Sequence, residues 1–369
     1  MEFKINQSEI ERCLQRVQGF VNLKGANPVL SNVKISTKGK SGIKAFATDY
    51  DIGLSGTYEA TVVKEGEVTL HAKRLFEIVR QLPNEEVIFR FSGTGRCEVE
   101  CGKSNFKLVT TDVSEFPEEP TFPKEQTVKV DLQMLKDMMD KTLYAASQNE
   151  SRMALNGIYC QLFPSSIKVV ATDGHRLSFV TRAVSLGIKE KISMILPRKG
   201  VVELKKLFDE MEDEASLTIA RVDNRIFFKI DKLEFFTREV EGTYPNYEQV
   251  IPQKNTKKAT INVENVKKSI KRVSTVSADK SYLIHFHFKK GKLEISSEVS
   301  EVGEAHEEVD VEFSAEPLKL GLNSQYILET LSHITSESAE LKLEGSEDAA
   351  LIKPTDDDDY VSIIMPMRI

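Results

Sequence analysis

VVATDGHRLSFV, residues 169–180, places Thr-Asp-Gly-His-Arg inside a run of strand-forming residues. Valine, leucine and phenylalanine on both sides favour β-strands, and Asp-Gly favours a turn between them. The same tripeptide Ala-Thr-Asp stands at 47–49, about one third of the 369 residues earlier. A repeat with so long a spacing is typical of copied domains, because the units of solenoid proteins span only about 20–50 residues.

Helical patterns recur at the same spacing. Stretches beginning near Ser8, Asp131 and Val263 predict one helix in each third of the chain, and each is followed by a strand, a turn and a strand. Second helices are predicted over 71–83, 197–211 and 323–334, the last opened by an Asn-Ser cap signal. We therefore predict an α+β fold of three similar domains, each with two helices and about eight strands. The predicted domains are 1–122, 123–253 and 254–369.

Composition limits the class of protein. Hydrophobic residues make up 40% and charged residues 29% of the chain, which is typical of globular proteins with real cores. The sequence shows neither a signal peptide nor about 18 consecutive apolar residues, so we expect a cytoplasmic protein without a membrane partner. Cys97 and Cys101 fall on one predicted strand about 13 Å apart, too far to share one zinc ion, and we expect them to be structural.

Positive charge collects on the predicted helices although the net charge is −7. Val263, Val266, Ile270 and Val273 form one apolar stripe, and Lys267, Lys268, Lys271 and Arg272 lie off it. Further basic residues on or beside the other helices are Lys24, Lys73, Arg74, Arg80, Arg198, Lys199, Lys205 and Lys206. Solvated helix faces are one explanation. If the helices share one surface, the pattern predicts weak, sequence-independent binding of phosphates.

Catalytic and metal-binding patterns are weak. His175 near Asp173 is compatible with a hydrolase that uses a distant serine, but no Gly-x-Ser-x-Gly motif accompanies it. His285 and His287 share a predicted strand face without a suitably spaced third ligand. Asp356 to Asp359 predict the solvated tip of a hairpin rather than a calcium loop. We expect a protein without catalytic residues, metal or cofactor.

Three motifs together carry a family resemblance: ATDGHRL at 171–177, PRKGV at 197–201 and MPMRI at 365–369. With the threefold repeat, they make the chain similar over its full length to the bacterial β sliding clamp, the processivity subunit of DNA polymerase III. The resemblance implies a non-catalytic homodimer, closed head to tail into a ring of six domains. Helices would line a hole around double-stranded DNA, and sheets would form the outer wall.

The resemblance also implies partners and sites. The partners would be the DNA polymerase III catalytic subunit, the clamp loader, other DNA polymerases and mismatch-repair proteins, whose short peptides would enter one hydrophobic pocket. Gly174 would let the ligand approach the backbone, and His175 and Arg176 would supply polar contacts at the rim. The implied pocket residues are Leu155, Thr172, Gly174, His175, Arg176, Leu177, Pro245, Val250, Asn323, Tyr326, Ile363, Ile364, Met365, Pro366, Met367 and Arg368.

The implied DNA-binding residues are Lys24, Lys73, Asn149, Arg152, Arg198, Lys199, Lys267 and Lys271. The implied dimer contact brings Phe106 and Leu108 to Thr275 and Val276 of a second copy, with Arg96 and Lys103 facing Glu301 and Glu304. The chain departs from the family pattern at Met153, Ala154, Gln249 and Ser281. A threefold-repeat scaffold that binds only proteins remains an alternative.

Overall fold

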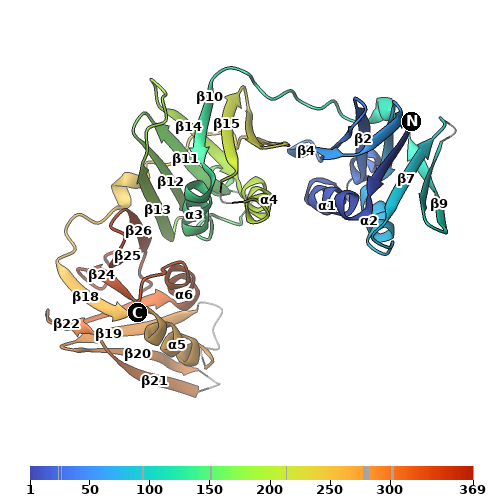
Figure 1. Cartoon of the computed structure of the whole chain (residues 1–369). Coiled ribbons are helices and arrows are strands. Elements are labelled where there is room, and N and C mark those ends of the chain that lie inside the picture. The colour runs from blue at the N-terminus through green and yellow to red at the C-terminus, as the bar shows by residue number, and fades with distance from the viewer. Residues whose placement is uncertain are drawn as a thin grey trace. The chain divides into compact units, whose positions relative to one another are not determined.

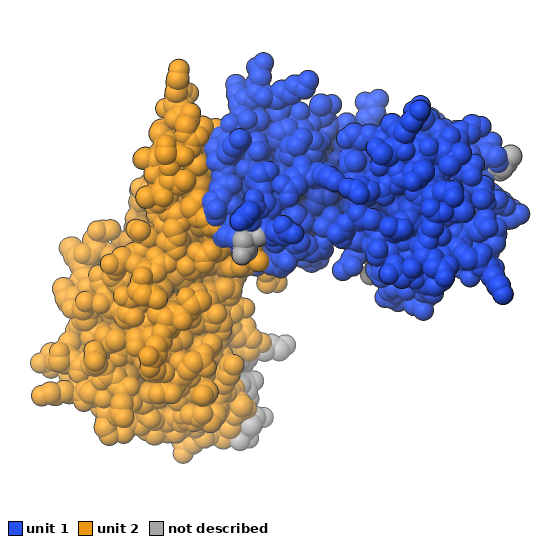
Figure 2. Space-filling view, in the orientation of Figure 1, with its two compact units in different colours: residues 1–133, 202–239 blue, residues 134–201, 240–369 orange. Residues whose placement is uncertain are grey.

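The computed structural model describes residues 1–369 except 24, 26, 94, 150–151, 213, 277–281, 301–302 and 369, and except the side chains of 298–300. The chain forms two compact units (Figure 2). Unit 1 contains Met1–Gln133 and Val202–Glu239, and unit 2 contains Met134–Val201 and Val240–Ile369. The division passes through the middle third of the sequence, so the two predicted domain boundaries stay a prediction.

Six α-helices lie in the described residues, two in each third of the chain, where the sequence predicts them (Figure 1). They are α1 Gln7–Val17, α2 Ala72–Val79, α3 Leu132–Leu143, α4 Arg198–Asp209, α5 Val263–Ser274 and α6 Ser324–Ser332. On α1 the buried residues Ile10, Cys13, Leu14 and Val17 follow helical spacing and form its core-facing stripe. Asn323 caps α6 by accepting hydrogen bonds from Gln325 N at 2.9 Å and Tyr326 N at 3.2 Å.

Strands follow each helix in the same order in all three thirds. The first third has β1 Glu2–Asn6, β2 Asn32–Lys38, β3 Gly42–Thr48, β4 Ile52–Glu59, β5 Thr61–Lys64, β6 Glu67–His71, β7 Glu86–Phe91, β8 Arg96–Cys101 and β9 Ser104–Thr111. The middle third has β10 Thr127–Asp131, β11 Gly157–Phe163, β12 Ser166–Thr172, β13 Arg176–Ala183, β14 Ile192–Pro197, β15 Ser216–Val222, β16 Arg225–Ile230 and β17 Leu233–Arg238. The last third has β18 Lys257–Asn262, β19 Leu283–Lys289, β20 Lys292–Ser300, β21 Gly303–Asp310, β22 Glu312–Phe313, β23 Leu318–Asn323, β24 Ser338–Leu343, β25 Ala350–Pro354 and β26 Tyr360–Ile364.

Each third therefore repeats one pattern twice: a strand, a helix and three strands. The short strands β5 and β22 are additions to this pattern in the first and last thirds. The fold class is α+β with antiparallel sheets, as the sequence predicts. The helices contribute to burial on one side of the sheets; in unit 1, for example, α1 contacts β1, β3 and β4.

Two strand pairings join consecutive thirds of the chain. In unit 1, β4 pairs antiparallel with β17 within a 13-stranded sheet, and we call this pairing the first seam. In unit 2, β13 pairs antiparallel with β26 within a nine-stranded sheet, and we call this pairing the second seam. A separate four-stranded sheet in unit 2 has the order β21-β20-β19-β23.

The cysteines of β8 and the aspartates of the last hairpin differ in how closely they follow the sequence predictions. Cys97 and Cys101 are buried on one face of β8, as a structural role requires. The hairpin around Asp356 to Asp359 is confirmed, but its tip is not wholly solvated, because Asp357 lies within 3.1 Å of Lys141 Nζ and 2.6 Å of Arg182 Nη2. No helix within the described residues is long and apolar enough to span a membrane.

Candidate functional site

The Thr-Asp-Gly-His-Arg segment is a tight turn between β12 and β13. Asp173 Oδ1 accepts hydrogen bonds from His175 N at 2.9 Å and Arg176 N at 3.0 Å. Thr172 Oγ1 accepts one from Gly174 N at 3.1 Å and donates to Arg176 O. These side chains replace the ladder bonds that the backbone gives up in the turn. Asp173 therefore holds the backbone of the turn. Its position next to His175 has this structural explanation and does not require a catalytic one.

The repeated Thr-Asp at 48–49 builds the same turn in unit 1. Asp49 Oδ1 accepts from Asp51 N at 3.0 Å and Ile52 N at 2.9 Å. Thr48 Oγ1 accepts from Tyr50 N at 3.0 Å and donates to Ile52 O at 2.8 Å. The third position has a positive φ in both turns, 78° at Tyr50 and 90° at Gly174. The repeated motif therefore specifies a turn, and any special function must come from the residues that differ.

Arg176 is the first such difference. Its side chain is only 8% exposed, and Nε lies 3.1 Å from Asp173 Oδ2. Its guanidinium also donates to Tyr144 O at 2.7 Å and to Glu329, and it lies 4.5 Å from the centre of the Tyr326 ring. Arg176 thus links β13 to the end of α3 and to α6. This guanidinium is largely buried, and Arg176 also lines the cleft beside the turn.

Gly174 and Arg152 lie against each other at the exposed side of the turn. Arg152 Nη1 donates to Asp173 O at 2.8 Å. A Cβ atom at Gly174 would lie 2.6 Å from Arg152 Nη1, and the φ of 90° also disfavours other residues. The family resemblance implies that Gly174 lets a ligand approach the backbone. In this structure the group that lies against Gly174 is the side chain of Arg152.

An apolar cluster straddles the second seam next to this turn. Leu177 of β13 lies directly opposite Ile363 of β26, and Ile363 lies opposite Leu351 of β25. Adjacent strand residues point to opposite faces, so Ile364 faces away from this cluster. The buried members of the cluster are Val170, Leu177, Ile195, Tyr244, Tyr247, Leu351, Val361 and Ile363. The partly buried residues packed against them are Leu155, Tyr159, Phe179, Val240, Ile251 and Ala349.

The C-terminal residues continue the seam past the turn. Met365 N donates to His175 O at 2.9 Å, and Met367 N donates to Gly321 O at 2.9 Å. The Met365 side chain is 42% exposed, which is unusual for a large apolar residue. Pro366 and Met367 are half-buried and Arg368 is exposed. A flexible, exposed methionine beside an apolar cluster suits contact with varied apolar ligands.

A cleft of about 380 Å³ opens on the polar side of the turn, lined by Gln148, Asn149, Arg152, His175, Tyr326 and Glu329 among others. The exposed ring of His175 lies 6.5 Å from the ring of Tyr326. Partial burial raises the pKa of Tyr326 above its usual value, and the negative charge of Asp173 adds to this rise. The cleft therefore offers polar groups of both charges, among them Arg152 and Glu329, next to an apolar surface.

The other implied pocket residues lie at varied depths. Thr172 is buried in the turn, and Pro245 and Val250 are exposed on the segment between β17 and β18. Asn323 caps α6, so its side chain has a structural task. The structure thus brings the turn, Leu155, the C-terminal residues and Tyr326 into one region of unit 2.

The implied DNA-binding residues differ in availability. Arg198 donates to Leu143 O at 2.9 Å at the end of α3, and burial lowers its pKa. Lys267 is 17% exposed and lies 2.7 Å from Glu264. Lys73, Asn149, Arg152, Lys199 and Lys271 are exposed. Lys24 lies outside the described residues.

The implied dimer residues lie near strand edges. Phe106 and Leu108 are half-buried on β9, and Thr275 and Val276 directly follow α5. Arg96, Lys103 and Glu304 are exposed, whereas Glu301 lies outside the described residues. Of the family departures, Met153 is 65% exposed, Ala154 is half-buried and Gln249 is exposed, and Ser281 is not described.

Sequence reasoning missed several residues of the site, notably Tyr144, Glu329, Tyr244 and Leu351. Tyr244 belongs to an aromatic-proline turn that recurs in the sequence, and this repeat was a usable signal. Tyr144 and Glu329 carry no local signal, because their partner Arg176 is distant in sequence. Among the described residues, no three histidine, cysteine or acidic side chains are grouped to hold a metal ion.

Comparisons with known proteins agree with this architecture. Models of the DNA polymerase III beta subunit match the chain as its N-terminal domain over residues 1–120, its central domain over 129–246 and its C-terminal domain over 248–368. The beta sliding clamp of Pseudomonas aeruginosa is 30% identical, with 100% of both chains covered. A crystal structure of the Pseudomonas aeruginosa DNA polymerase III subunit beta superposes with a TM-score of 0.95 at 29% identity, covering 100% of both chains. A Caulobacter crescentus pol III beta structure gives a TM-score of 0.92 at 28% identity, also over 100% of both chains.

Proposed function

Since the chain belongs to the DNA polymerase III beta subunit family, the sliding clamps, we propose that two copies close into a ring around double-stranded DNA. The ring tethers the DNA polymerase III catalytic subunit and recruits the clamp loader, other DNA polymerases and mismatch-repair proteins. It performs these tasks in the cytoplasm, by binding and without catalysis.

The sheet topology is the observation that carries the proposal. Each seam joins the third strand after the first helix of one third (β4 or β13) to the third strand after the second helix of the next third (β17 or β26). By the same rule, β21 of the last third and β9 of the first third are the two strands left over. Pairing β21 with β9 of a second copy repeats the seam a third time, and two such pairings close a ring.

Both of these strands have free edges. Within the described residues, β21 pairs with β20 alone, and β9 pairs with β6 only at Thr110 and Thr111. Exposed strand edges invite pairing with another chain unless they are protected. The charges are complementary, since Lys103 and Lys107 lie on or beside β9, whereas Glu304, Glu308 and Asp310 are exposed on β21. We propose Phe106, Leu108, Thr275 and Val276 as apolar and small contacts beside this pairing.

Helix-borne basic residues supply the DNA-facing surface. Lys73 lies 4.0 Å from Glu77, with both side chains 55% exposed. An exposed pair of this kind contributes little stability, so Lys73 can exchange its partner for a phosphate. Lys199 and Lys271 are also exposed, and such phosphate contacts carry no sequence information. A closed ring needs only weak contacts, because topology keeps it on the DNA.

The second seam supplies the partner site. The exposed Met365 follows the strand of Ile363, which is buried with Leu177 in the apolar cluster, next to the polar cleft of His175, Arg152 and Tyr326. An exposed apolar side chain beside a cleft with several polar groups fits a short peptide with apolar anchors. A structure of the Pseudomonas aeruginosa relative bound to griselimycin is consistent with ligand binding in this family.

Retention on DNA tests the proposal. The protein, loaded by its clamp loader onto nicked circular DNA, is expected to stay bound through gel filtration and to dissociate when the circle is cut once. Lys73→Glu with Lys271→Glu should weaken loading, whereas Lys290→Glu, a matched exposed lysine on the β19–β20 turn, should not. Equal retention on circular and linear DNA would contradict encirclement and favour the protein-only scaffold.

A further inference from the structure

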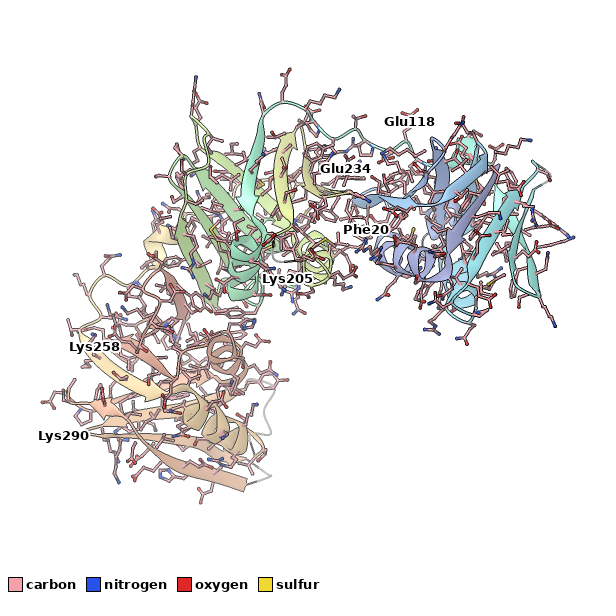
Figure 3. All side chains as sticks on the ribbon, in the orientation of Figure 1. Phe20, Glu118, Lys205, Glu234, Lys258 and Lys290 are labelled. Carbon is pink, nitrogen blue, oxygen red and sulfur yellow. The ribbon has the colours of Figure 1, made fainter. Side chains whose placement is uncertain are left out.

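A second groove crosses unit 1 beside the segment that links β9 to β10. It has a volume of about 520 Å³, and its lining includes Lys44, Phe122, Pro123, Lys124, Lys129 and Lys229. Glu234 of β17 also lines it and is labelled in Figure 3. The groove lies on the same sheet as the first seam, so it is separate from the proposed partner site in unit 2.

One wall of the groove is a straight row of side chains. Lys129 of β10 lies opposite Thr218 of β15, Thr218 opposite Lys229 of β16, and Lys229 opposite Glu234 of β17. Residues directly opposite each other in a sheet share a face. Lys129 and Lys229 are two strands apart, about 10 Å, so they present two positive charges along the row.

The other wall is the linking segment itself. The Phe122 ring packs edge to face on the Phe227 ring, with 6.2 Å between centres. Lys229 Nζ lies 5.5 Å from the centre of the Phe122 ring. Lys44 Nζ, on β3, lies 2.7 Å from Glu119 Oε1 and ties the segment to the sheet. These contacts give the groove a fixed wall with an apolar face.

The charge of the groove is opposite to that of the whole chain. Four lysines line it against two glutamates, in a protein of net charge −7. Lys44 pairs with Glu119, and Lys229 lies 2.9 Å from Glu234. Lys124 and Lys129 are exposed, and within the described residues neither makes an ion pair. A ligand with two or more carboxylates would neutralise this excess of positive charge.

We propose that this groove docks an extended acidic segment of a partner protein. The two free lysines receive its carboxylates, and Phe122 and Pro123 pack against an apolar residue of the same segment. A segment of about four or five residues spans the row, because four neighbouring strands extend over about 14 Å and extended chain rises about 3.3 Å per residue. Charge complementarity of this kind acts mainly on the association rate and on the choice of partner.

Fluorescence anisotropy with a labelled synthetic peptide tests the proposal. The probe is a short peptide of alternating glutamate and threonine that contains one phenylalanine. Lys124→Glu with Lys129→Glu, which reverses the two free lysines, should weaken its binding to the full chain at least about tenfold at low salt, and Lys290→Glu should change it little. A peptide with lysine in place of glutamate should bind the doubly reversed variant more tightly than the wild type.

Three results would overturn the assignment. The first is equal binding of the acidic peptide to the wild type and the doubly reversed variant. The second is loss of binding on Leu177→Ala, which would place the peptide at the second seam. The third is equally effective competition by a single-stranded oligonucleotide of the same charge, which would assign the groove to nucleic acid. Retention on circular DNA should not change in the doubly reversed variant, so failure here is separable from failure of the ring proposal.

Discussion

The first and second seams have the same pattern of backbone hydrogen bonds, but different side chains lie at equivalent positions. Both begin at a Thr-Asp turn with the same hydrogen bonds, and both extend the ladder by one bond, from Arg238 N to Asp51 O at 2.7 Å and from Met365 N to His175 O at 2.9 Å. Gly53 stands in the first seam where Leu177 stands in the second, each one residue beyond the turn. Phe236 faces Gly53, and Ile363 faces Leu177.

This difference separates a closed surface from an open one. In the first seam Phe46, Phe116, Phe227 and Phe236 belong to one buried cluster, and Phe122 of the linking segment packs against it. In the second seam Met365 and Val250 remain 42% and 50% exposed beside the apolar cluster. Both clusters contain the chain's own aromatic rings, Tyr244 and Tyr247 in the second, so the exposed Met365 and Val250 are what distinguish the second seam as the proposed partner site.

Gly53→Leu is expected to have the largest effect. A Cβ atom at Gly53 would lie 2.2 Å from Phe236 Cε1, so leucine must displace that ring from the core. We expect unit 1 to lose about 3 kcal/mol of unfolding free energy, measured by denaturant titration. Adding Phe236→Ala should make Gly53→Leu less costly than it is alone. Unchanged stability of the single variant would show that Phe236 does not fill the seam.

Arg176→Met is expected to have the second largest effect. It removes the hydrogen bonds that tie β13 to α3 and α6, and the first seam has no such bonds because Ile52 stands at the equivalent position. Asp173 and the carbonyl of Tyr144 would lose their partner, and we expect a loss of about 2–3 kcal/mol in unit 2. Ile52→Met at the equivalent position of the first turn conserves apolar volume and should cost less than about 1.5 kcal/mol. Equal losses in the two variants would refute the distinction between the turns.

Asp357 makes the second seam sensitive to acid. Burial alone would raise its pKa, but hydrogen bonds from Arg182 and Lys141 outweigh this and hold the pKa below the usual 3.8. Stabilisation is therefore complete above pH 3.8 and is lost as the pH falls through the lower folded pKa. Asp357→Asn should lower stability by about 1–2 kcal/mol at neutral pH and flatten the dependence below that pH. A pH profile identical to the wild type would contradict this assignment.

The smallest stability effect is expected for Gly174→Ala. The substitution places a side chain at a φ of 90° and against Arg152, so we expect a loss of about 1 kcal/mol. Tyr50→Gly at the equivalent position of the first turn relieves the positive φ and should be near neutral. Thermal unfolding of both variants checks the pair, and a destabilising Tyr50→Gly would show that this side chain makes a contact that outweighs the strain.

Leu177→Ala in the second seam and Leu54→Ala in the first seam are expected to differ in their effect on peptide binding. Leu177 is 3% exposed and belongs to the apolar cluster beside the exposed Met365, so its truncation weakens the packing beneath the open seam. We expect a peptide from the DNA polymerase III catalytic subunit to bind about tenfold more weakly. Leu54→Ala beside the first seam should leave peptide affinity unchanged while it destabilises unit 1, since Leu54 is 1% exposed. Equal peptide affinity for the wild type and Leu177→Ala would remove the second seam as the partner site.

Local patterns in the sequence predicted most of the fold. Apolar spacing and cap signals located the six helices found in the described residues, and the repeated Ala-Thr-Asp located equivalent turns in unit 1 and unit 2. The short strands β5 and β22 were not predicted, because two to four residues carry too little pattern. The burial of Arg176 and the pairing of Asp357 also escaped prediction, since their partners Glu329 and Arg182 are 153 and 175 positions away.

The mass of the native particle tests the central claim, that a third seam between β9 and β21 joins two copies. The account predicts a particle of twice 41.6 kDa at micromolar concentration. Lys103→Glu with Lys107→Glu on the β9 side should shift the equilibrium toward the monomer, whereas Lys290→Glu should not. A wild-type particle of 41.6 kDa would contradict the account.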